Sequence, residues 1–390
     1  MKRLRSRMEA VQSPIIPIVA EMIRQTPGTI SLGQGVVYYG PPPEAIARLQ
    51  DFLAEPRLNR YQAVEGIAPL RQTIATKLKT DNDIAVGEDT CIVVTAGSNM
   101  GFMNAVLAIT EPGDEVILQT PYYFNHEMAI GIAGCRATLV ETDATYQPQP
   151  DAIAAAITDK TRAVVTISPN NPTGAVYNAD TLAAINQLCC DRGLYHIHDE
   201  AYEYFTYGGA RHVSPAALPN SSGHTISLFS LSKAYGFASW RIGYMVLPRP
   251  LLDPVKKIQD TILICPPVVS QYAALGALER GADYCRENIG AIAATRHRLL
   301  TSLKSLGDRC TVAPANGAFY CFLKLQTSLG AFEVVERLIR EYQVAVIPGT
   351  TFGLDDEADH CYLRAAYGAL QSETAFEAID RLIKGLRAIL

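Results

Sequence analysis

The sequence predicts an α/β protein with two domains. Between Ala68 and about Pro250, short apolar runs alternate with amphipathic stretches, a pattern typical of a parallel sheet covered by helices. After about Cys285, long amphipathic helices flank short strands, which is typical of a smaller α+β domain. The chain has 390 residues, more than one hydrophobic core usually holds. We therefore expect a large domain at residues 46–284 and a small domain formed by residues 1–45 and 285–390.

Apolar runs and helical periodicity predict the individual elements. The strands expected in the large domain are Cys91–Thr95, Glu115–Gln119, Ala163–Ile167, Leu194–His198, Thr225–Phe229 and Ile242–Leu247. The helices expected there are Ala68–Lys79, Ser98–Ile109 and Asp180–Asp191. The small domain is expected to contain helices Arg286–Leu306 and Thr374–Ile389 and strands Ala318–Leu323 and Tyr362–Ala366. No GxGxxG motif follows the first strand, so dinucleotide binding is not expected.

Composition favours a small-molecule function. Hydrophobic residues make up 48% of the chain, charged residues 19%, and the formal net charge is -5. This charge balance gives no general attraction to nucleic acid, so we expect no nucleic-acid partner. The apolar stretches, such as Thr261–Val269, are interrupted by prolines well short of the roughly 20 residues that span a bilayer. We therefore expect no membrane partner either.

The amino-terminal residues and the cysteines favour a cytoplasmic location. The first residues include the basic side chains Lys2, Arg3, Arg5 and Arg7. No apolar signal segment follows them, and Pro14, Pro17 and Glu21 are expected to interrupt both a signal segment and a continuous amphipathic helix. The nine cysteines include no CxxC pair, and an odd number fits reduced thiols.

The strongest chemical signal is Lys233, which follows an apolar strand. An isolated lysine is usually a solvated surface residue. Here Ser230 and Ser232 precede the lysine, and Arg241 follows it. A phosphorylated aldehyde needs an amine that forms an imine, together with hydroxyl and cationic groups that hold its phosphate. The sequence provides each of these groups within one short segment.

Two further polar segments follow neighbouring strands of the predicted sheet. Asn171 lies in the segment NNPTG, which could be only a turn, and Asp199 begins DEAYE, where it could be only a helix cap. The carboxyl ends of parallel strands meet at one crevice, so Asn171, Asp199 and Lys233 can face one ligand. His196 and His198 form an HxH pair, but without further ligands we expect them to pack rather than to bind a metal.

These segments belong to a longer series of motifs. In order, the series is LGQG at residues 32–35, RYQAVEG at 60–66, VTAGSN at 94–99, PYYFNH at 121–126, NNPTG at 170–174, DEAYE at 199–203, SLSK at 230–233, WRIGY at 240–244 and YLRAAYG at 362–368. Together they resemble the class I/II aminotransferases of fold-type I, over nearly the whole chain. The resemblance implies a large domain with a mainly parallel sheet between helices, a smaller α+β domain, and pyridoxal 5'-phosphate (PLP) as cofactor.

The resemblance also implies roles for individual residues. Lys233 would hold PLP as a Schiff base and move the substrate proton. Asp199 would pair with the pyridine nitrogen, and Tyr202 and Asn171 would donate to the phenolic oxygen. His126 would orient Asp199 from behind. These residues form the expected catalytic centre, with Lys233, Asp199 and Tyr202 as its catalytic members.

Other residues are implied as contacts of the cofactor and the substrate. The expected phosphate contacts are Gly97, Ser98, Asn99, Ser230, Ser232 and Arg241. Tyr123 would stack on the ring, although it could be only a core tyrosine. Tyr61 would reach the phosphate of a neighbouring subunit, which implies a homodimer with shared active sites. Arg364, in YLRAAYG, would clamp the substrate carboxylate, with Gly35 and Asn171 beside it.

The implied reaction exchanges amino and oxo groups between an amino acid and a 2-oxo acid by a ping-pong mechanism. A C–S β-lyase on the same fold keeps the same cofactor residues and stays an alternative. A PLP-binding regulator is not expected, because a DNA-binding domain does not fit into the short segment before LGQG. These alternatives differ in chemistry but not in the cofactor site.

The substrate is expected to be aromatic or methionine. The segments near the site carry aromatic residues: Tyr38, Tyr39, Tyr122, Tyr123 and Phe124. The stretch VKKIQDTILICPPVVSQ contains no arginine for a second carboxylate, which would be costly to bury alone. This stretch, with YEYF and GVVYYGPP, resembles the plant members of the family that use methionine to aminate aromatic 2-oxo acids. Aspartate specificity stays an alternative, because other basic residues can bind a side-chain carboxylate.

Overall fold

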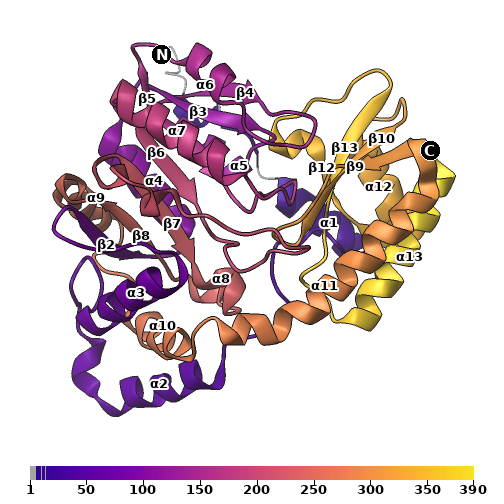
Figure 1. Cartoon of the computed structure of the whole chain (residues 1–390). Helices are drawn as coiled ribbons and strands as arrows, with labels where there is room; N and C mark the ends of the chain where they lie inside the picture. Colours follow the sequence, from indigo (N-terminus) through magenta and orange to yellow (C-terminus); the bar gives the residue numbers. More distant parts are fainter. Residues whose placement is uncertain (1–5, 10, 14) are drawn as a thin grey trace, which may run out of the picture.

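A seven-stranded sheet forms the larger part of the molecule in the computed structural model, which describes residues 6–9, 11–13 and 15–390 (Figure 1). In spatial order the strands are β2 (Thr90–Thr95), β8 (Gly243–Pro248), β7 (Thr225–Ser230), β6 (Tyr195–Asp199), β5 (Thr161–Ile167), β3 (Glu115–Thr120) and β4 (Arg136–Glu141). Only β8 runs antiparallel to its neighbours β2 and β7. The expected mainly parallel sheet is therefore confirmed.

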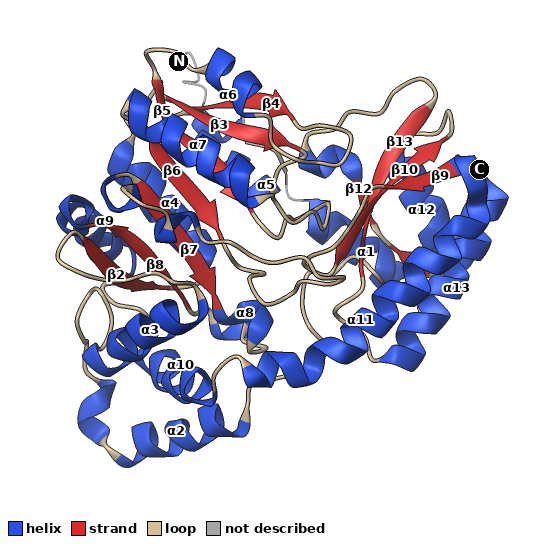
Figure 2. Cartoon of the chain, viewed as in Figure 1, coloured by secondary structure: helices blue, strands red, loops and turns tan. Residues whose placement is uncertain are grey.

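Helices cover both faces of this sheet (Figure 2). The α-helices of the described residues are α1 (Ile15–Gln25), α2 (Pro43–Ala54), α3 (Ala68–Asp81), α4 (Ser98–Ile109), α5 (Phe124–Ile132), α6 (Pro150–Ala156), α7 (Ala179–Arg192), α8 (Leu231–Ala234), α9 (Leu252–Leu263), α10 (Val268–Arg280), α11 (Asp283–Leu303), α12 (Ala331–Tyr342) and α13 (Ser372–Ile389). On one face, α4, α5 and α9 share a buried cluster with the strands. On the other face, α3 and α10 cover one half and α6 and α7 the other half. Burial of strands on both faces explains why they appear in the sequence as continuous apolar runs.

A second, four-stranded antiparallel sheet lies beside the first (Figure 1). Its strands, in spatial order, are β12 (Ile347–Pro348), β13 (His360–Ala366), β10 (Tyr320–Gln326) and β9 (Cys310–Val312). A short parallel pair, β1 (Ile30–Ser31) with β11 (Val344–Ala345), ties the amino-terminal segment to this region. Helix α11 runs from beside α10 to this sheet and packs on α13. We propose the division into residues 46–284 and residues 1–45 with 285–390 on the basis of these two sheets.

The expected strands and helices lie within a few residues of the observed ones, but several observed elements were not predicted, among them helices α2, α5, α6, α9, α10 and α12 and the short strands β1, β9, β11 and β12. The edge strand β4 was not predicted, because most of its side chains are exposed or half-buried and give no apolar run. The expectation that Pro17 and Glu21 interrupt a helix is wrong, since α1 spans both. Pro17 lies in the first turn of α1, where its missing N–H has no intrahelical partner to lose.

The other amino-terminal residues of that prediction, Lys2, Arg3, Arg5 and Pro14, lie outside the described residues. No helix in the described part of the chain is long and apolar enough to cross a bilayer. All nine cysteines are unpaired, as expected for reduced thiols.

Candidate active site

The carboxyl ends of the parallel strands converge on one pocket. Its lining consists of Ile167, Ala201 and the predicted residues Ser98, Asn99, Tyr123, Asn171, Asp199, Tyr202, Ser230, Ser232, Lys233 and Arg241. Strands β2, β3, β5, β6 and β7 all end at this edge of the sheet, and the loop or helix after each strand provides a polar side chain. Because β8 is antiparallel, its amino-terminal end brings Arg241 to the same edge. Residues at the ends of six strands thus meet around one space.

Lys233 lies in the one-turn helix α8, directly after β7. Its Nζ donates a hydrogen bond to the carbonyl oxygen of Gly35 at 2.6 Å and lies 5.8 Å from the ring centre of Tyr202. Burial, followed by the positive charges of Arg241 and Arg364, lowers the pKa of the Lys233 amine from 10.5 to about 8, while Asp199 acts in the opposite direction. Lys233 therefore has a larger neutral, nucleophilic fraction near neutral pH than an exposed lysine.

Asp199 ends β6 and is buried at 5% exposure. Its Oδ1 accepts a hydrogen bond from the backbone N–H of Ala201 at 3.1 Å. Its Oδ2 lies 3.2 Å from Nε2 of His126, whose ring stacks on Phe102 with ring centres 3.9 Å apart. His126 thus lies where it was expected, behind the carboxylate. A buried carboxylate held in this way can pair with a positively charged nitrogen in the pocket.

Hydroxyl groups and a helix terminus form the other end of the pocket. Gly97 precedes α4 with φ 82°, and a side chain there would collide with the guanidinium of Arg241. The glycine therefore lets Arg241 approach the amino terminus of α4, where free backbone amides and the helix dipole favour an anion. The Ser230 hydroxyl accepts a hydrogen bond from the backbone N–H of Ser232 at 3.2 Å. Together with Ser98, these groups suit a phosphate.

Tyr123 directly precedes α5 and lines the pocket. Its hydroxyl accepts a hydrogen bond from Asn125 Nδ2 at 2.7 Å and lies 3.4 Å from Asn99 Oδ1. The side chain is only half-buried, which argues against a purely core tyrosine. An aromatic ring held by its hydroxyl at the pocket wall can stack on a flat ligand.

Arg364 lies on β13 of the second sheet and is buried at 3% exposure. Its Nη1 donates to Asn171 Oδ1 at 2.9 Å and its Nη2 donates to the carbonyl oxygen of Gly33 at 2.7 Å. Within residues 15–390 its guanidinium has no carboxylate partner, and burial lowers its pKa. An unpaired buried cation is costly, so this position favours an anionic ligand such as a carboxylate.

Four predicted residues are absent from this pocket lining: Gly97 and Arg364, described above, and Tyr61 and Gly35. Tyr61 follows the short helical segment Pro56–Asn59 and is 77% exposed. Gly35 contacts Lys233 through its carbonyl oxygen, whereas the carbonyl oxygen bonded to Arg364 belongs to Gly33. Tyr38 and Tyr39, which were expected near the substrate, are also absent from the lining. Tyr39 bonds to the main chain of Lys233, and Tyr38 bonds to Asn288.

Tyr320 and Phe352 were not predicted as site residues. Both are buried, and both rings lie against Arg364, at 4.7 Å and 4.9 Å from its guanidinium carbon. The Tyr320 hydroxyl also lies 2.7 Å from the hydroxyl of Tyr202. Tyr320 occurs in an apolar strand run, which looks like core, and only the fold reveals the polar contact.

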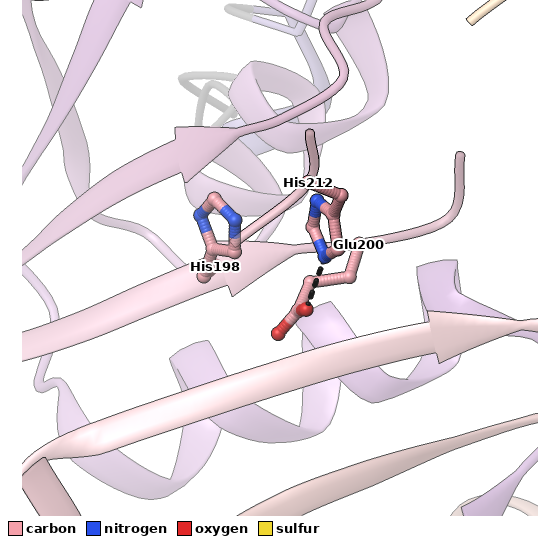
Figure 3. A group of neighbouring side chains, drawn as sticks. All are labelled: His198, Glu200 and His212. Carbon is pink, nitrogen blue, oxygen red and sulfur yellow. Dashed lines mark hydrogen bonds and ion pairs between the residues drawn. The ribbon is translucent and has the colours of Figure 1, made fainter. Parts of the chain in front are cut away.

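A second polar group, formed by His198, Glu200 and His212, lies apart from the pocket lining (Figure 3). His198 and Asp199 are consecutive in β6, so their side chains point to opposite faces. Glu200 Oε2 accepts a hydrogen bond from Nε2 of His212 at 2.7 Å and another from the Ser214 hydroxyl. His198 Nδ1 lies 2.6 Å from Thr166 Oγ1. These residue types can bind metals, but the nitrogen of His212 that faces Glu200 is already a hydrogen-bond partner.

The sequence matches the family model for aminotransferase class I and II over residues 27–382. The chain belongs to the class I and II aminotransferases. Its fold is fold-type I of this family, which uses PLP. The crystal structure of Pyrococcus protein-A1 superimposes with a TM-score of 0.91, at 32% identity and 98% coverage of both chains. The aminotransferase fold thus accounts for both sheets.

Similar aminotransferases carry two kinds of substrate name. The aromatic aminotransferase ISS1 of Arabidopsis thaliana is 32% identical over 99% of this chain and 97% of its own length. The aspartate/prephenate aminotransferase of Thermus thermophilus is also 32% identical, over 99% of both chains. Overall similarity to aminotransferases therefore does not separate aromatic from acidic substrates.

The lowered pKa of Lys233 predicts a chemical titration. In the cofactor-free aminotransferase, acetylation of Lys233 by acetic anhydride should follow a midpoint near pH 8, because only the neutral amine reacts. Below that midpoint the ammonium form dominates, so the rate should fall roughly tenfold per pH unit. Arg241→Gln should raise the midpoint, since it removes a positive charge that disfavours the ammonium form. Mass spectrometry of the Lys233 peptide measures the rate at each pH.

Arg298→Gln is the matched control, because Arg298 is an exposed arginine of α11 paired with Asp380. It should leave the midpoint unchanged. A wild-type midpoint near the ordinary value of 10.5 would contradict this account of Lys233.

Proposed function

We propose that this chain is a PLP-dependent aminotransferase in which Lys233 holds the cofactor covalently and an amino acid exchanges its amino group with a 2-oxo acid. The observation that carries this proposal is the half-buried Lys233, with its lowered pKa, in one pocket with Asp199 and the phosphate-binding donors. The bound cofactor supplies an electron sink for the carbanion formed at the substrate α-carbon. The residues of the chain would bind the cofactor and the substrate, orient them, and move the substrate proton.

Lys233 would act first as the anchor and then as the base. Once a substrate amine replaces it, its Nζ can rest on the carbonyl oxygen of Gly35, to which it is hydrogen-bonded at 2.6 Å. The lowered pKa leaves a substantial neutral fraction near pH 8, which suits proton transfer at the substrate α-carbon. The carbonyl oxygen of Gly35 would thus support the base, and the role of Gly35 beside the substrate carboxylate stays a prediction.

Asp199, Tyr202 and Asn171 would hold the cofactor ring. The buried Asp199 carboxylate, backed by His126, would stabilise a protonated pyridine nitrogen by charge pairing. Tyr202 and Asn171 line the same pocket and would donate hydrogen bonds to the phenolic oxygen. Ser98, Ser230, Ser232, Arg241 and the amides after Gly97 would hold the phosphate, with Asn99 nearby and Tyr123 against the ring.

We propose aromatic amino acids or methionine as the preferred amino donors. Arg364 would bind the α-carboxylate, and the buried rings of Tyr320 and Phe352 pack against its guanidinium. Arg241 and Arg364 are the basic residues whose charges lower the pKa of Lys233, and both would already bind other groups, the phosphate and the α-carboxylate. The similarity to ISS1 supports this choice, whereas the similarity to aspartate/prephenate aminotransferases supports aspartate as the alternative.

We also propose a homodimer with shared active sites. Tyr61 is 77% exposed and does not line the pocket of its own chain, which supports a role at the pocket of a second subunit. The unpaired cysteines support a cytoplasmic location for this dimer.

Lys233→Ala tests the proposed anchor. The variant should fold, because the side chain lines a pocket rather than a core, but its amino-transfer rate should fall at least about a hundredfold. Borohydride should fix PLP to the wild-type chain at the Lys233 peptide and not to the variant. PLP fixed to another lysine of the variant would refute the assignment, and release of pyruvate and ammonia from a cysteine conjugate would show the β-lyase instead.

A substrate panel tests the proposed donor class. We expect kcat/KM for phenylalanine, tyrosine, tryptophan or methionine to exceed that for aspartate, with a common 2-oxo acid acceptor. The reason is that a second carboxylate would lack a partner in the pocket. An aspartate preference of about tenfold, roughly 1.4 kcal/mol in transition-state binding, would reverse this conclusion.

Mixing two inactive variants tests the shared site. Tyr61→Ala and Lys233→Ala each disable both sites of their own homodimer, but a mixed dimer pairs a normal Lys233 with the partner's normal Tyr61 at one site. After subunit exchange at equal concentrations, activity should return to about a quarter of wild type. Tyr61→Ala mixed with a double variant that lacks both residues is the control. Absence of recovery in exchanged dimers would show that Tyr61 does not serve the partner's site.

A further inference from the structure

Tyr320 lies directly behind Tyr202 at the start of β10. It is buried at 1% exposure, and its ring meets that of Tyr202 edge-on, with centres 5.4 Å apart and planes at 79°. The two hydroxyl oxygens are 2.7 Å apart. Within residues 15–390, Tyr202 is the only hydrogen-bond partner of the Tyr320 hydroxyl. The two hydroxyls therefore form a pair in which one must donate to the other.

The neighbours of Tyr202 restrict how this pair can be arranged. A guanidinium can only donate, so Arg364 Nη1, at 2.9 Å, fixes Asn171 with its Oδ1 toward the arginine. The amide nitrogen of Asn171 then faces the Tyr202 oxygen, at 3.4 Å, and can only donate to it. Tyr202 thus receives one weak hydrogen bond from Asn171 and has a single proton of its own to direct.

Two directions remain for that proton. Tyr202 can donate to Tyr320, or it can donate into the pocket while Tyr320 donates to Tyr202. When an electron-rich oxygen lies in the pocket beside Tyr202, only the second arrangement satisfies both hydroxyl protons. Any other direction would leave the Tyr320 proton buried without an acceptor, which folded proteins rarely tolerate. A hydroxyl that accepts a hydrogen bond is also a stronger donor.

We propose that Tyr320 is a positioning residue that directs the Tyr202 proton toward the phenolic oxygen of the cofactor and strengthens that hydrogen bond. This inference rests on the proposed PLP function. The surroundings hold Tyr320 in place for this role. The guanidinium of Arg364 lies 4.7 Å over its ring, and Gly35 leaves space for its hydroxyl where a side chain would collide. The hydroxyl therefore has little freedom to turn away from Tyr202.

Tyr320→Phe in the PLP-loaded enzyme tests the inference through the pH midpoint of the cofactor's visible absorbance. Negative charge on the phenolic oxygen stabilises the proton on the nitrogen that joins Lys233 to the cofactor. A hydrogen-bond donor to this oxygen reduces that stabilisation. Weakening that donor should therefore raise the midpoint, by about 0.5 pH unit or roughly threefold in proton affinity. The phenylalanine ring keeps the packing against Arg364, so the fold and the KM for the amino acid should change little.

A double-mutant cycle separates this role from a structural one. Tyr202→Phe should raise the midpoint further than Tyr320→Phe, and adding Tyr320→Phe to Tyr202→Phe should change nothing more. Tyr207→Phe is the matched control, because this buried tyrosine donates at 2.8 Å to the carbonyl oxygen of Ala318, away from the pocket. Its midpoint should equal that of wild type.

Three results would overturn the role of Tyr320. These are additive shifts in the double variant, a shift in Tyr202→Phe without one in Tyr320→Phe, and loss of the cofactor from Tyr320→Phe but not from Tyr202→Phe. The last result would show that Tyr320 acts on its own account. A wild-type chain without any titrating visible band would instead overturn the proposed PLP function, so the two failures are distinguishable.

Discussion

The parallel order of β2, β3, β5, β6 and β7 is the constraint on which the site depends. Parallel strands bring their carboxyl ends to one edge of the sheet, so polar residues far apart in the sequence share one pocket. The buried apolar strands hold these ends in register, with both faces covered by helices. The reversal of β8 adds an amino-terminal end to the same edge and thereby brings Arg241 to the phosphate-binding groups. The core of the protein and its pocket are consequences of the same topology.

The pocket has more positive charge and more hydrogen-bond donors than it can satisfy by itself. The positive charges of Arg241 and Arg364 lower the pKa of Lys233, and the carboxylate of Asp199 raises it. Burial and mutual repulsion lower the pKa of Lys233 and burial lowers that of Arg364. An anionic ligand would relieve both costs at once, which fits a phosphorylated cofactor together with an amino acid carboxylate. The same repulsion prepares Lys233 to act as a neutral amine.

The sequence could predict the elements with strong apolar patterns and the site residues that occur within motifs. Lys233, Asp199 and Asn171 follow buried strands, so their position at one edge could be inferred before their contacts were known. Strand β4 was not predicted because an exposed edge strand lacks an apolar run. Helix α1 was not predicted because Pro17 was expected to break a helix, whereas proline is tolerated in the first turn, where Pro17 lies. Tyr320 escaped because a buried tyrosine in an apolar strand gives no sign of the hydroxyl that it meets across the fold.

The hydrogen bonds of Arg364 show how the second sheet can take part in the chemistry of the first. Arg364 bonds through Nη1 to Asn171, in the loop after β5, and through Nη2 to Gly33 in the amino-terminal segment. A guanidinium has five N–H donors, and neutral oxygens take only two of them here, so its charge is positioned without being neutralised. The Nε donor is buried and has no partner in the described chain. With the free hydrogens of the Nη atoms, it leaves enough donors for the two-pronged bond that a substrate carboxylate would make. Some hydrogens of the guanidinium therefore orient Arg364, and its other hydrogens remain free to bind a carboxylate.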